Sequence, residues 1–248
     1  MPTEWPKALW LVRHGESAGN VARDAAHKKG LERIAIEAQR DMDVPLSPLG
    51  EKQAAAVARW LRAQPAKVRP TAVLTSPYLR ARRTAEILVE QSKLSHLSLV
   101  VDERLREREF GVLDRLTRRG IEKLFPDQAA LRKALGKFYH RPPGGESWCD
   151  VILRLRTVID TLCRELRGER IVLVGHSVVV LCFRYLLERM TEEQILAIDA
   201  GVDVANCSIT SYELEGRKLE LRRFNFVAPL LEEGAPVTTE PDAPYKPR

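Results

Sequence analysis

Short apolar runs alternate with longer segments of helical periodicity along most of the chain. The runs span residues 8–13, 72–75, 97–101 and 171–174. Between them, apolar residues recur at i, i+3, i+4 and i+7, as they do within residues 54–61. A continuous apolar run bounded by turn residues is typical of a strand buried on both faces. The pattern therefore predicts an α/β fold, a three-layer sandwich whose central, mostly parallel sheet is flanked by helices on both faces.

Capping residues mark where several predicted helices begin. The candidate N-caps are Ser17, Ser47, Ser76 and Ser147. A serine hydroxyl at this position accepts a hydrogen bond from one of the first free N–H groups of the helix. After the first of these caps, residues 18–40 predict a helical segment that is interrupted near Gly30.

The second half of the chain carries two further boundaries. Residues 117–138 have helical periodicity broken by Pro126, which predicts two helices because proline cannot continue a helical hydrogen-bond ladder. Residues 208–214 and 218–224 flank a glycine and predict a closing hairpin.

The alternation of strands and helices runs without a break that would separate two domains. We therefore expect residues 1–228 to form a single α/β domain with lid insertions near residues 18–42 and 112–145. The tail, residues 229–248, is rich in Pro, Glu and Thr and lacks apolar periodicity, so we expect it to be loosely ordered.

Composition and charge narrow the function classes. No apolar run approaches the roughly 20 residues that span a bilayer, and the N-terminus lacks a signal-peptide core, so we expect a cytoplasmic protein without a membrane partner. The net charge of +6 is spread along the chain and favours anionic ligands in general. Clustered basic and aromatic residues are absent, and the sequence therefore predicts no nucleic-acid partner. It does not indicate an oligomeric state.

Two histidines follow two of the predicted strands. His14 comes after the run at 8–13, and His176 comes after the run at 171–174. The carboxyl ends of parallel strands meet at one edge of a sheet, where open α/β sheets bind ligands. Arg13 precedes the first histidine, and a guanidinium presents a planar fork of donors suited to phosphate. The sequence therefore predicts an anion-binding site that contains both imidazoles.

A metal site is the rival interpretation of these histidines. The sequence contains neither an H-x-x-x-H pattern nor a carboxylate-histidine pair at ligand spacing, and its four cysteines show no C-x-x-C spacing. The arginines near the first histidine would also repel a cation. We therefore expect neither a metal nor another cofactor.

Four motifs in a fixed order make the prediction more specific. They are Leu-Trp-Leu-Val-Arg-His-Gly-Glu-Ser at 9–17, Ser-Pro-Tyr-Leu-Arg-Ala at 76–81, Leu-Arg-Glu-Arg-Glu-Phe-Gly at 105–111 and Gly-His-Ser at 175–177. Each motif alone is a weak signal, but the four together resemble the histidine phosphatase superfamily, in its phosphoglycerate-mutase-like branch. The resemblance extends from Leu9 to the closing hairpin and implies a phosphoglycerate-mutase-like fold.

The resemblance also implies roles for individual residues. It makes His14 the nucleophile, which forms a phosphohistidine, and Glu107 the proton donor to the leaving oxygen. The residues implied to hold the phosphoryl group are Arg13, Asn20, Arg80 and His176. Glu109 and Glu103 remain rivals for the acid, because only the Leu-x-Glu spacing before Phe-Gly selects Glu107.

Other arginines and one glutamate are expected to have plainer roles. We expect the side chains of Arg23, Arg82, Arg83 and Arg108 to be solvated, because exposed helix arginines usually are. We expect Glu146, which follows a tight Gly-Gly turn, to tie this turn to the helix start.

The resemblance leaves three functions open. The favoured one is a phosphomonoester hydrolase acting on a small molecule, because residues 138–147 look similar to the broad-specificity phosphatase members. The first alternative is a 2,3-bisphosphoglycerate-dependent phosphoglycerate mutase, although the sequence after Asn20 departs from the mutase pattern. The second is a catalytically silent phosphate-binding protein on the same fold. The sequence does not indicate the physiological substrate.

Overall fold

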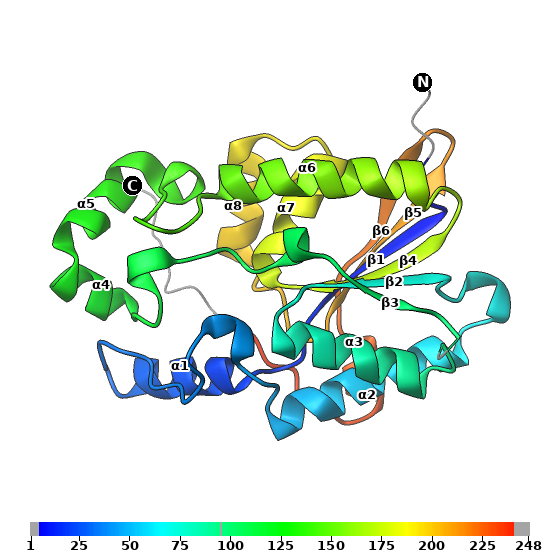
Figure 1. The fold of residues 1–248 in the computed structure, drawn as a ribbon, viewed down its shortest axis with the longest axis horizontal. Helices are drawn as coiled ribbons and strands as arrows, with labels where there is room; N and C mark the ends of the chain where they lie inside the picture. The colour runs from blue at the N-terminus through cyan, green and yellow to red at the C-terminus, as the bar shows by residue number, and fades with distance from the viewer. Residues whose placement is uncertain (1–4, 95, 241–248) are drawn as a thin grey trace.

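The computed structural model describes residues 5–94 and 96–240 and is built around a six-stranded sheet in the order β3-β2-β4-β1-β5-β6 (Figure 1). The strands are β1 (Ala8–Arg13), β2 (Ala72–Thr75), β3 (Leu99–Val101), β4 (Arg170–Gly175), β5 (Ile209–Glu215) and β6 (Lys218–Phe226). The first four strands are parallel, and β5 and β6 form the antiparallel hairpin at one edge. The mostly parallel sheet is thus confirmed.

Helices cover both faces of the sheet, as the three-layer prediction requires (Figure 1). One layer contains α2 (Pro48–Ala63), α3 (Leu79–Gln91) and α9 (Ala228–Glu232), and the other contains α6 (Trp148–Glu165), α7 (Ser177–Leu187) and α8 (Glu192–Gly201). Side chains of β1 alternate between them: Leu9 and Leu11 pack with Trp148, whereas Trp10 and Val12 pack with α2 and α3. This period of two explains why residues 8–12 of β1 and residues 171–174 of β4 are apolar without alternation.

The remaining helices lie together beyond the carboxyl ends of the parallel strands (Figure 1). They are α1 (Ala18–Lys28), α4 (Arg118–Leu124) and α5 (Pro126–Tyr139), and the last two are separate helices as predicted. Throughout residues 5–94 and 96–240, no helix is both long and apolar enough to cross a membrane.

The helical prediction for residues 31–40 is wrong. Helix α1 ends at Lys28, and Gly30 follows with a φ of 61° that a helix does not contain. Beyond it, the backbone pairs with a distant segment: the Ile34 N–H donates to the Arg115 carbonyl at 2.9 Å, and the Thr117 hydroxyl donates to the Leu31 carbonyl at 2.7 Å. These hydrogen bonds to residues 115–117 replace the i to i−4 hydrogen bonds that a helix would have formed.

Ser76 does not cap α3, which is a second correction. The helix begins at Leu79 with Tyr78 in the N-cap position, and no side chain caps it. The Ser76 hydroxyl instead lies 2.8 Å from Nε2 of His176. The other predicted caps, Ser17, Ser47 and Ser147, accept hydrogen bonds from their helices.

The tail differs from the expected loose ordering over the residues that the structure describes. Residues 228–232 form α9, whose Leu230 is fully buried, and the chain beyond it returns across the molecule. The side chain of Gln53 donates to the Pro236 carbonyl at 2.9 Å and so fixes the path of the tail. Residues 241–248 of the predicted tail lie outside the described residues.

Candidate active site

The two strand-end histidines lie side by side at the carboxyl edge of the sheet. Strands β1 and β4 are adjacent and parallel, with Arg13 opposite Gly175, so His14 and His176 follow at the same level. Their ring centroids are 5.2 Å apart with an interplanar angle of 64°. Both side chains are buried, at 2% and 0% exposure, and the structure thus brings together the pair that the sequence predicted.

The His14 ring is oriented by the backbone next to it. Its Nδ1 lies 2.7 Å from the Gly15 carbonyl oxygen, which can only accept, so Nδ1 carries the proton and Nε2 keeps its lone pair. Burial and the nearby guanidiniums of Arg80 and Arg13 lower the pKa of His14 well below its usual value. The imidazole is therefore neutral and nucleophilic at neutral pH.

The turn after His14 requires a glycine. A Cβ at Gly15 would lie 2.4 Å from the carbonyl oxygen of Gly50, so the two backbones touch directly. The Gly15 N–H donates to the hydroxyl of Thr84 at 3.1 Å, which ties the same turn to α3. Gly50 at the start of α2 and Thr84 on α3 thus hold the histidine turn in one position.

Arg13 and Asn20 present donors on one side of His14. The Arg13 guanidinium is 1% exposed, and its Nη1 donates to the Val204 carbonyl at 2.5 Å. Asn20 closes the capping box of α1, so its side chain is fixed by Ser17. The free ends of both side chains reach the same carboxylate: Arg13 Nη2 and Asn20 Nδ2 lie 2.9 and 2.6 Å from Oε2 of Glu240.

Arg80 reaches the site from the first turn of α3 and meets a carboxylate as well. Its Nη1 donates to the Asp41 carbonyl at 2.7 Å and its Nη2 to Oδ2 of the same residue at 2.9 Å. Burial disfavours the charged guanidinium, but Asp41 outweighs this effect and raises the pKa of Arg80. Arg80 is therefore a permanent cation in the site.

His176 links the second strand end to the segment before α3. Its Nε2 lies 2.8 Å from Ser76 Oγ, and its Nδ1 lies 3.5 Å from Oε2 of Glu107. The Tyr78 ring contacts the imidazole edge to face, with centroids 5.1 Å apart. Burial and the charge of Arg80 lower the pKa of His176 well below its usual value, so this second imidazole is also neutral.

Glu107 faces the histidines, whereas its rivals do not. Its Oε1 accepts the Arg108 N–H at 2.8 Å, and burial raises the pKa of its carboxyl. The exposed Glu109 instead accepts a hydrogen bond from the Tyr78 hydroxyl at 2.6 Å, and Glu103 is exposed on a short helical turn. Only Glu107 of the three lines the cavity.

Glu146 fixes the loop that carries Glu107. The Glu146 carboxylate accepts from Arg106 Nη2 at 2.6 Å and from Arg154 Nε at 3.0 Å. Arg154 also donates to the Glu107 carbonyl at 3.3 Å. The glutamate therefore does more than tie its own turn to a helix start, because it also holds the loop of the candidate acid.

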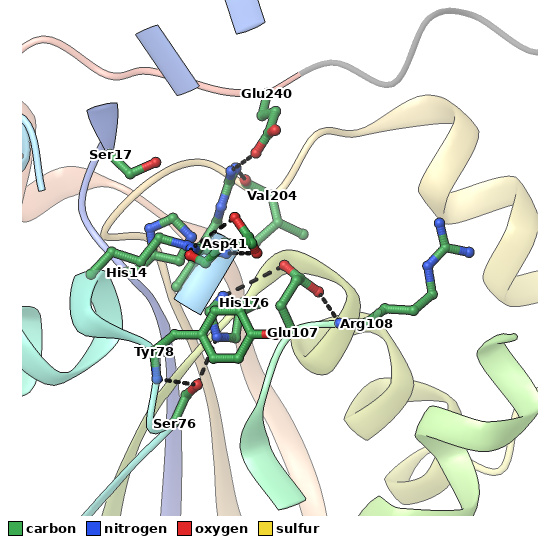
Figure 2. Close-up of polar contacts among 12 residues, drawn as sticks. His14, Ser17, Asp41, Ser76, Tyr78, Glu107, Arg108, His176, Val204 and Glu240 are labelled. Carbon is green, nitrogen blue, oxygen red and sulfur yellow. Dashed lines mark hydrogen bonds and ion pairs between the residues drawn. The ribbon is translucent and has the colours of Figure 1, made fainter. Parts of the chain in front are cut away.

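A cavity of about 110 Å³ lies between these groups. Figure 2 shows the side chains of His14, Asp41, Glu107 and His176 gathered around one space, whereas the Arg108 side chain extends away from the two histidines. Arg23 and Arg108 line the cavity, contrary to the expectation that they are simply solvated, whereas Arg82 and Arg83 are exposed elsewhere on α3. The segments predicted as insertions also line the cavity, with Ile34, Ile36, Asp114 and Lys137.

Sequence reasoning missed three groups in this site. Asp41 and Glu240 lie in segments without regular periodicity, and nothing in the sequence indicates that they reach the arginines. Ser76 stood within a recognised motif but was interpreted as a helix cap. Its position just after a strand is the signal that would have identified it.

The chemical groups of this arrangement are of the kind that phosphoryl transfer uses. It contains an imidazole Nε2 with a free lone pair, two guanidiniums for the charge on phosphoryl oxygens and a carboxyl whose raised pKa favours the protonated form. Within the described part of the chain, no group of three His, Cys, Asp or Glu side chains could hold a metal ion.

Comparisons with known proteins agree with this geometry. The family model described as "Histidine phosphatase superfamily (branch 1)" matches residues 9–227. The chain is 36% identical over 177 residues to a probable phosphoglycerate mutase GpmB of Photorhabdus laumondii, covering 70% of this chain and 71% of that protein. It is also 32% identical over 192 residues to the 6-phosphofructo-2-kinase/fructose-2,6-bisphosphatase of Gallus gallus, covering 76% of this chain and 34% of that longer protein.

Solved structures show the same relationship. A mycobacterial glucosyl-3-phosphoglycerate phosphatase, solved with VO3, is 27% identical and superposes with a TM-score of 0.68, covering 89% of this chain and 99% of that one. The alpha-ribazole phosphatase of Shigella flexneri, at 22% identity and a TM-score of 0.68 over 88% of this chain and 96% of that one, shares the fold. The chain is therefore an enzyme of the histidine phosphatase type and belongs to branch 1 of the histidine phosphatase superfamily.

Proposed function

We propose that the protein hydrolyses small-molecule phosphomonoesters through a phosphohistidine on His14. The observation that carries the proposal is the fixed tautomer of this histidine, because the Gly15 carbonyl holds the proton on Nδ1 and leaves Nε2 free to attack. A nucleophile of this kind needs no separate base, since its lone pair is already available at neutral pH.

In the first step, the lone pair of His14 Nε2 forms a bond to phosphorus while the bond from phosphorus to the ester oxygen breaks. Glu107 gives its proton to this leaving oxygen, so an alcohol departs. The raised pKa of Glu107 supports this role, because a buried carboxyl keeps its proton at a higher pH than an exposed one.

In the second step, a water oxygen attacks phosphorus and the bond from Nε2 to phosphorus breaks. The Glu107 carboxylate takes a proton from the attacking water, which restores the acid for the next cycle. Inorganic phosphate leaves, and His14 returns to its neutral state.

The charge of the transferred group requires donors on several sides. We assign the phosphoryl oxygens to Arg13, Asn20, Arg80 and His176. The assignment is supported by the ion pairs that Arg13 and Arg80 form with carboxylates at 2.9 Å, because the same N–H groups can donate to the oxygens of a phosphoryl group. Two guanidiniums supply the stabilisation that a divalent cation gives in other phosphoryl-transfer enzymes, and the proposal therefore includes no metal.

The mutase alternative has support from several relatives that are named probable phosphoglycerate mutase GpmB, at 34% to 36% identity. A mutase must protect its phosphohistidine from water until the bound intermediate has re-oriented in the site. The residues of the irregular segment after α1 that line the cavity are Ile34, Ile36 and Asp41, none of which is a cation for a phosphoglycerate carboxylate. We therefore favour water as the acceptor, and we rank a silent binding protein below both enzymes because every proposed catalytic group is in place.

One experiment separates these functions. The purified protein is incubated with a simple phosphomonoester and, separately, with 3-phosphoglycerate with and without 2,3-bisphosphoglycerate. Phosphate release from the ester without formation of 2-phosphoglycerate supports the hydrolase. Rapid isomerisation that depends on the bisphosphate would establish the mutase instead, and no reaction in either arm would establish the silent protein.

A further inference from the structure

The C-terminal tail places a carboxylate inside the candidate active site. Glu240, 227 residues after Arg13, forms an ion pair of 2.9 Å with the guanidinium of this buried arginine. The same Oε2 atom accepts from Asn20 Nδ2 at 2.6 Å, and Oε1 lies 2.6 Å from Arg23 Nε. Figure 2 shows Glu240 reaching the cavity from the segment above it.

These contacts match what a phosphoryl group would receive. Arg13 and Asn20 are two of the residues that we assign to the phosphoryl oxygens, and Glu240 uses a free donor of each. A carboxylate and a phosphate are both oxyanions that accept charge-assisted hydrogen bonds from guanidiniums. Because Glu240 already lies against both Nη2 of Arg13 and Nδ2 of Asn20, the glutamate and a substrate phosphate compete for the same position.

The tail is anchored just before this glutamate. The Thr238 hydroxyl accepts from Gln53 Nε2 and donates to Asn206 Oδ1, each at 3.0 Å, and the Asn206 N–H donates to the Thr238 carbonyl at 2.9 Å. Gln53 and Asn206 are fully buried. An anchor two residues away holds the Glu240 carboxylate at a high effective concentration beside Arg13.

We propose that the tail is an internal competitor for phosphate, in which the Glu240 carboxylate occupies the Arg13–Asn20–Arg23 anion subsite until an anionic ligand displaces it. The proposal rests on the assignment of this subsite to the phosphoryl group. A site filled by the tail for nine-tenths of the time binds phosphate about tenfold more weakly than an open site, because apparent affinity scales with the open fraction. The tail thus lowers the apparent affinity of the subsite for every anion, so that only tightly binding anions occupy it.

Calorimetric titration of the full chain with inorganic phosphate tests the competition without requiring turnover. We expect Glu240→Gln to bind phosphate about tenfold more tightly than the parent protein, since a neutral amide loses the ion pairs with both arginines. Thr238→Val keeps the tail charge but removes the hydroxyl anchor, and we expect it to tighten phosphate binding in the same direction. The matched control is Glu233→Gln, which removes a tail carboxylate that pairs with Arg59 outside the cavity, and we expect no change.

Three results would overturn the proposal. Equal phosphate affinity in all four proteins would show that the tail does not compete. Tighter phosphate binding in Glu240→Gln but not in Thr238→Val would show that the loss of one negative charge, and not release of the tail, causes the effect. Phosphate binding in none of the four, with unchanged melting temperatures, would eliminate the anion subsite and with it the proposed function. In the first of these cases, continued hydrolysis of the ester would show that the tail proposal alone has failed.

Discussion

The strand ends and the segments that lie over them bring opposite charges to one cavity. Arg13, His14 and His176 come from the carboxyl ends of β1 and β4, are at most 2% exposed and are fixed by the hydrogen bonds of the sheet. Asp41 comes from a single 3-10 turn and Glu240 from the irregular tail, and they are 34% and 24% exposed. The first region is preorganised for an anion, and the second supplies anions that a ligand can replace.

This difference predicts that the strand ends serve the chemical step, whereas the overlying segments serve the selection of the ligand. A group held by a parallel ladder keeps its place when the ligand changes, and preorganised donors of this kind stabilise charge in a transition state. A carboxylate on an irregular segment can leave its arginine at little cost in the rest of the fold. We therefore expect substitutions at the strand ends to act on kcat and substitutions in the overlying segments to act on KM.

The largest expected effect is at His14. His14→Ala removes the nucleophile, and we expect kcat for phosphomonoester hydrolysis to fall by about 10³-fold or more. Steady-state phosphate release measures the effect, and His27→Ala, at an exposed position on α1, is the matched control. Appreciable turnover in a folded His14→Ala protein would contradict covalent catalysis at this residue.

Arg80 lies on α3, but we expect it to act together with the residues at the ends of β1 and β4. Its variant therefore tests whether the strand-end residues and the overlying segments differ in role. Arg80→Ala deletes a donor to the transition-state oxygens, so we expect kcat/KM to fall by about 10²- to 10³-fold. Arg82→Ala on the same helix, whose guanidinium is 48% exposed, should change the rate very little. Similar losses in both variants would indicate a general effect of charge on this helix.

The effect of Glu107 depends on the substrate. Glu107→Gln removes the proton donor, so we expect a fall of about 10²-fold for an alkyl phosphate and a much smaller fall for nitrophenyl phosphate, whose leaving group needs little protonation. Kinetics with both substrates measure the difference, and Glu109→Gln is the control. Equal losses for the two substrates in Glu107→Gln, with the selective loss in Glu109→Gln, would assign the acid to Glu109.

The pH dependence of kcat/KM reports two of these groups. The acid must be protonated, so the rate falls as pH rises through the pKa of Glu107, which burial raises above its usual value. The nucleophile must be neutral, so the rate falls as pH drops through the pKa of His14, which burial and two arginines lower well below 6.5. We expect the alkaline limb to disappear in Glu107→Gln with the nitrophenyl substrate, and its persistence there would assign it to another group.

The smallest effect is expected at Asp41. A substrate phosphate replaces this carboxylate on Arg80, so Asp41→Asn should lower KM by about two- to fivefold and leave kcat nearly unchanged, as for a partly exposed ion pair. Asp43→Asn, which affects only an exposed pair with Arg40, is the matched control. A large loss of kcat in Asp41→Asn would mean that Asp41 positions Arg80 for catalysis, and the division between the two regions would fail.

Much of the fold could be predicted because its signals are local. The apolar runs at β1, β2 and β4 coincide with observed strands, and Pro126 divides two helices where the ring excludes a backbone donor. Residues 31–40 were misinterpreted because their spacing is helical, whereas their hydrogen-bond partners lie at 115–117. A prediction from the spacing of neighbouring residues cannot detect hydrogen-bond partners that are about 80 positions away in the sequence.

The candidate site divides in the same way. His14 and His176 could be found because each directly follows an apolar run, and the motifs around Arg80 and Glu107 carry the remaining groups that the resemblance implies. Asp41 and Glu240 could not be found, because their contacts connect residues 39 and 227 positions apart through irregular backbone. Their positions follow from how the chain closes over the sheet.

The distance between the two imidazoles is inherited from the sheet itself. Neighbouring strands lie about 4.8 Å apart, and the ring centroids of His14 and His176, one residue beyond the paired Arg13 and Gly175, are 5.2 Å apart. An insertion or exchange in residues 29–47 or 112–145 leaves this spacing untouched, because neither segment contributes to the β1–β4 ladder. Grafting these segments from a relative is therefore a route to new substrate preferences that keeps the spacing of the reacting groups.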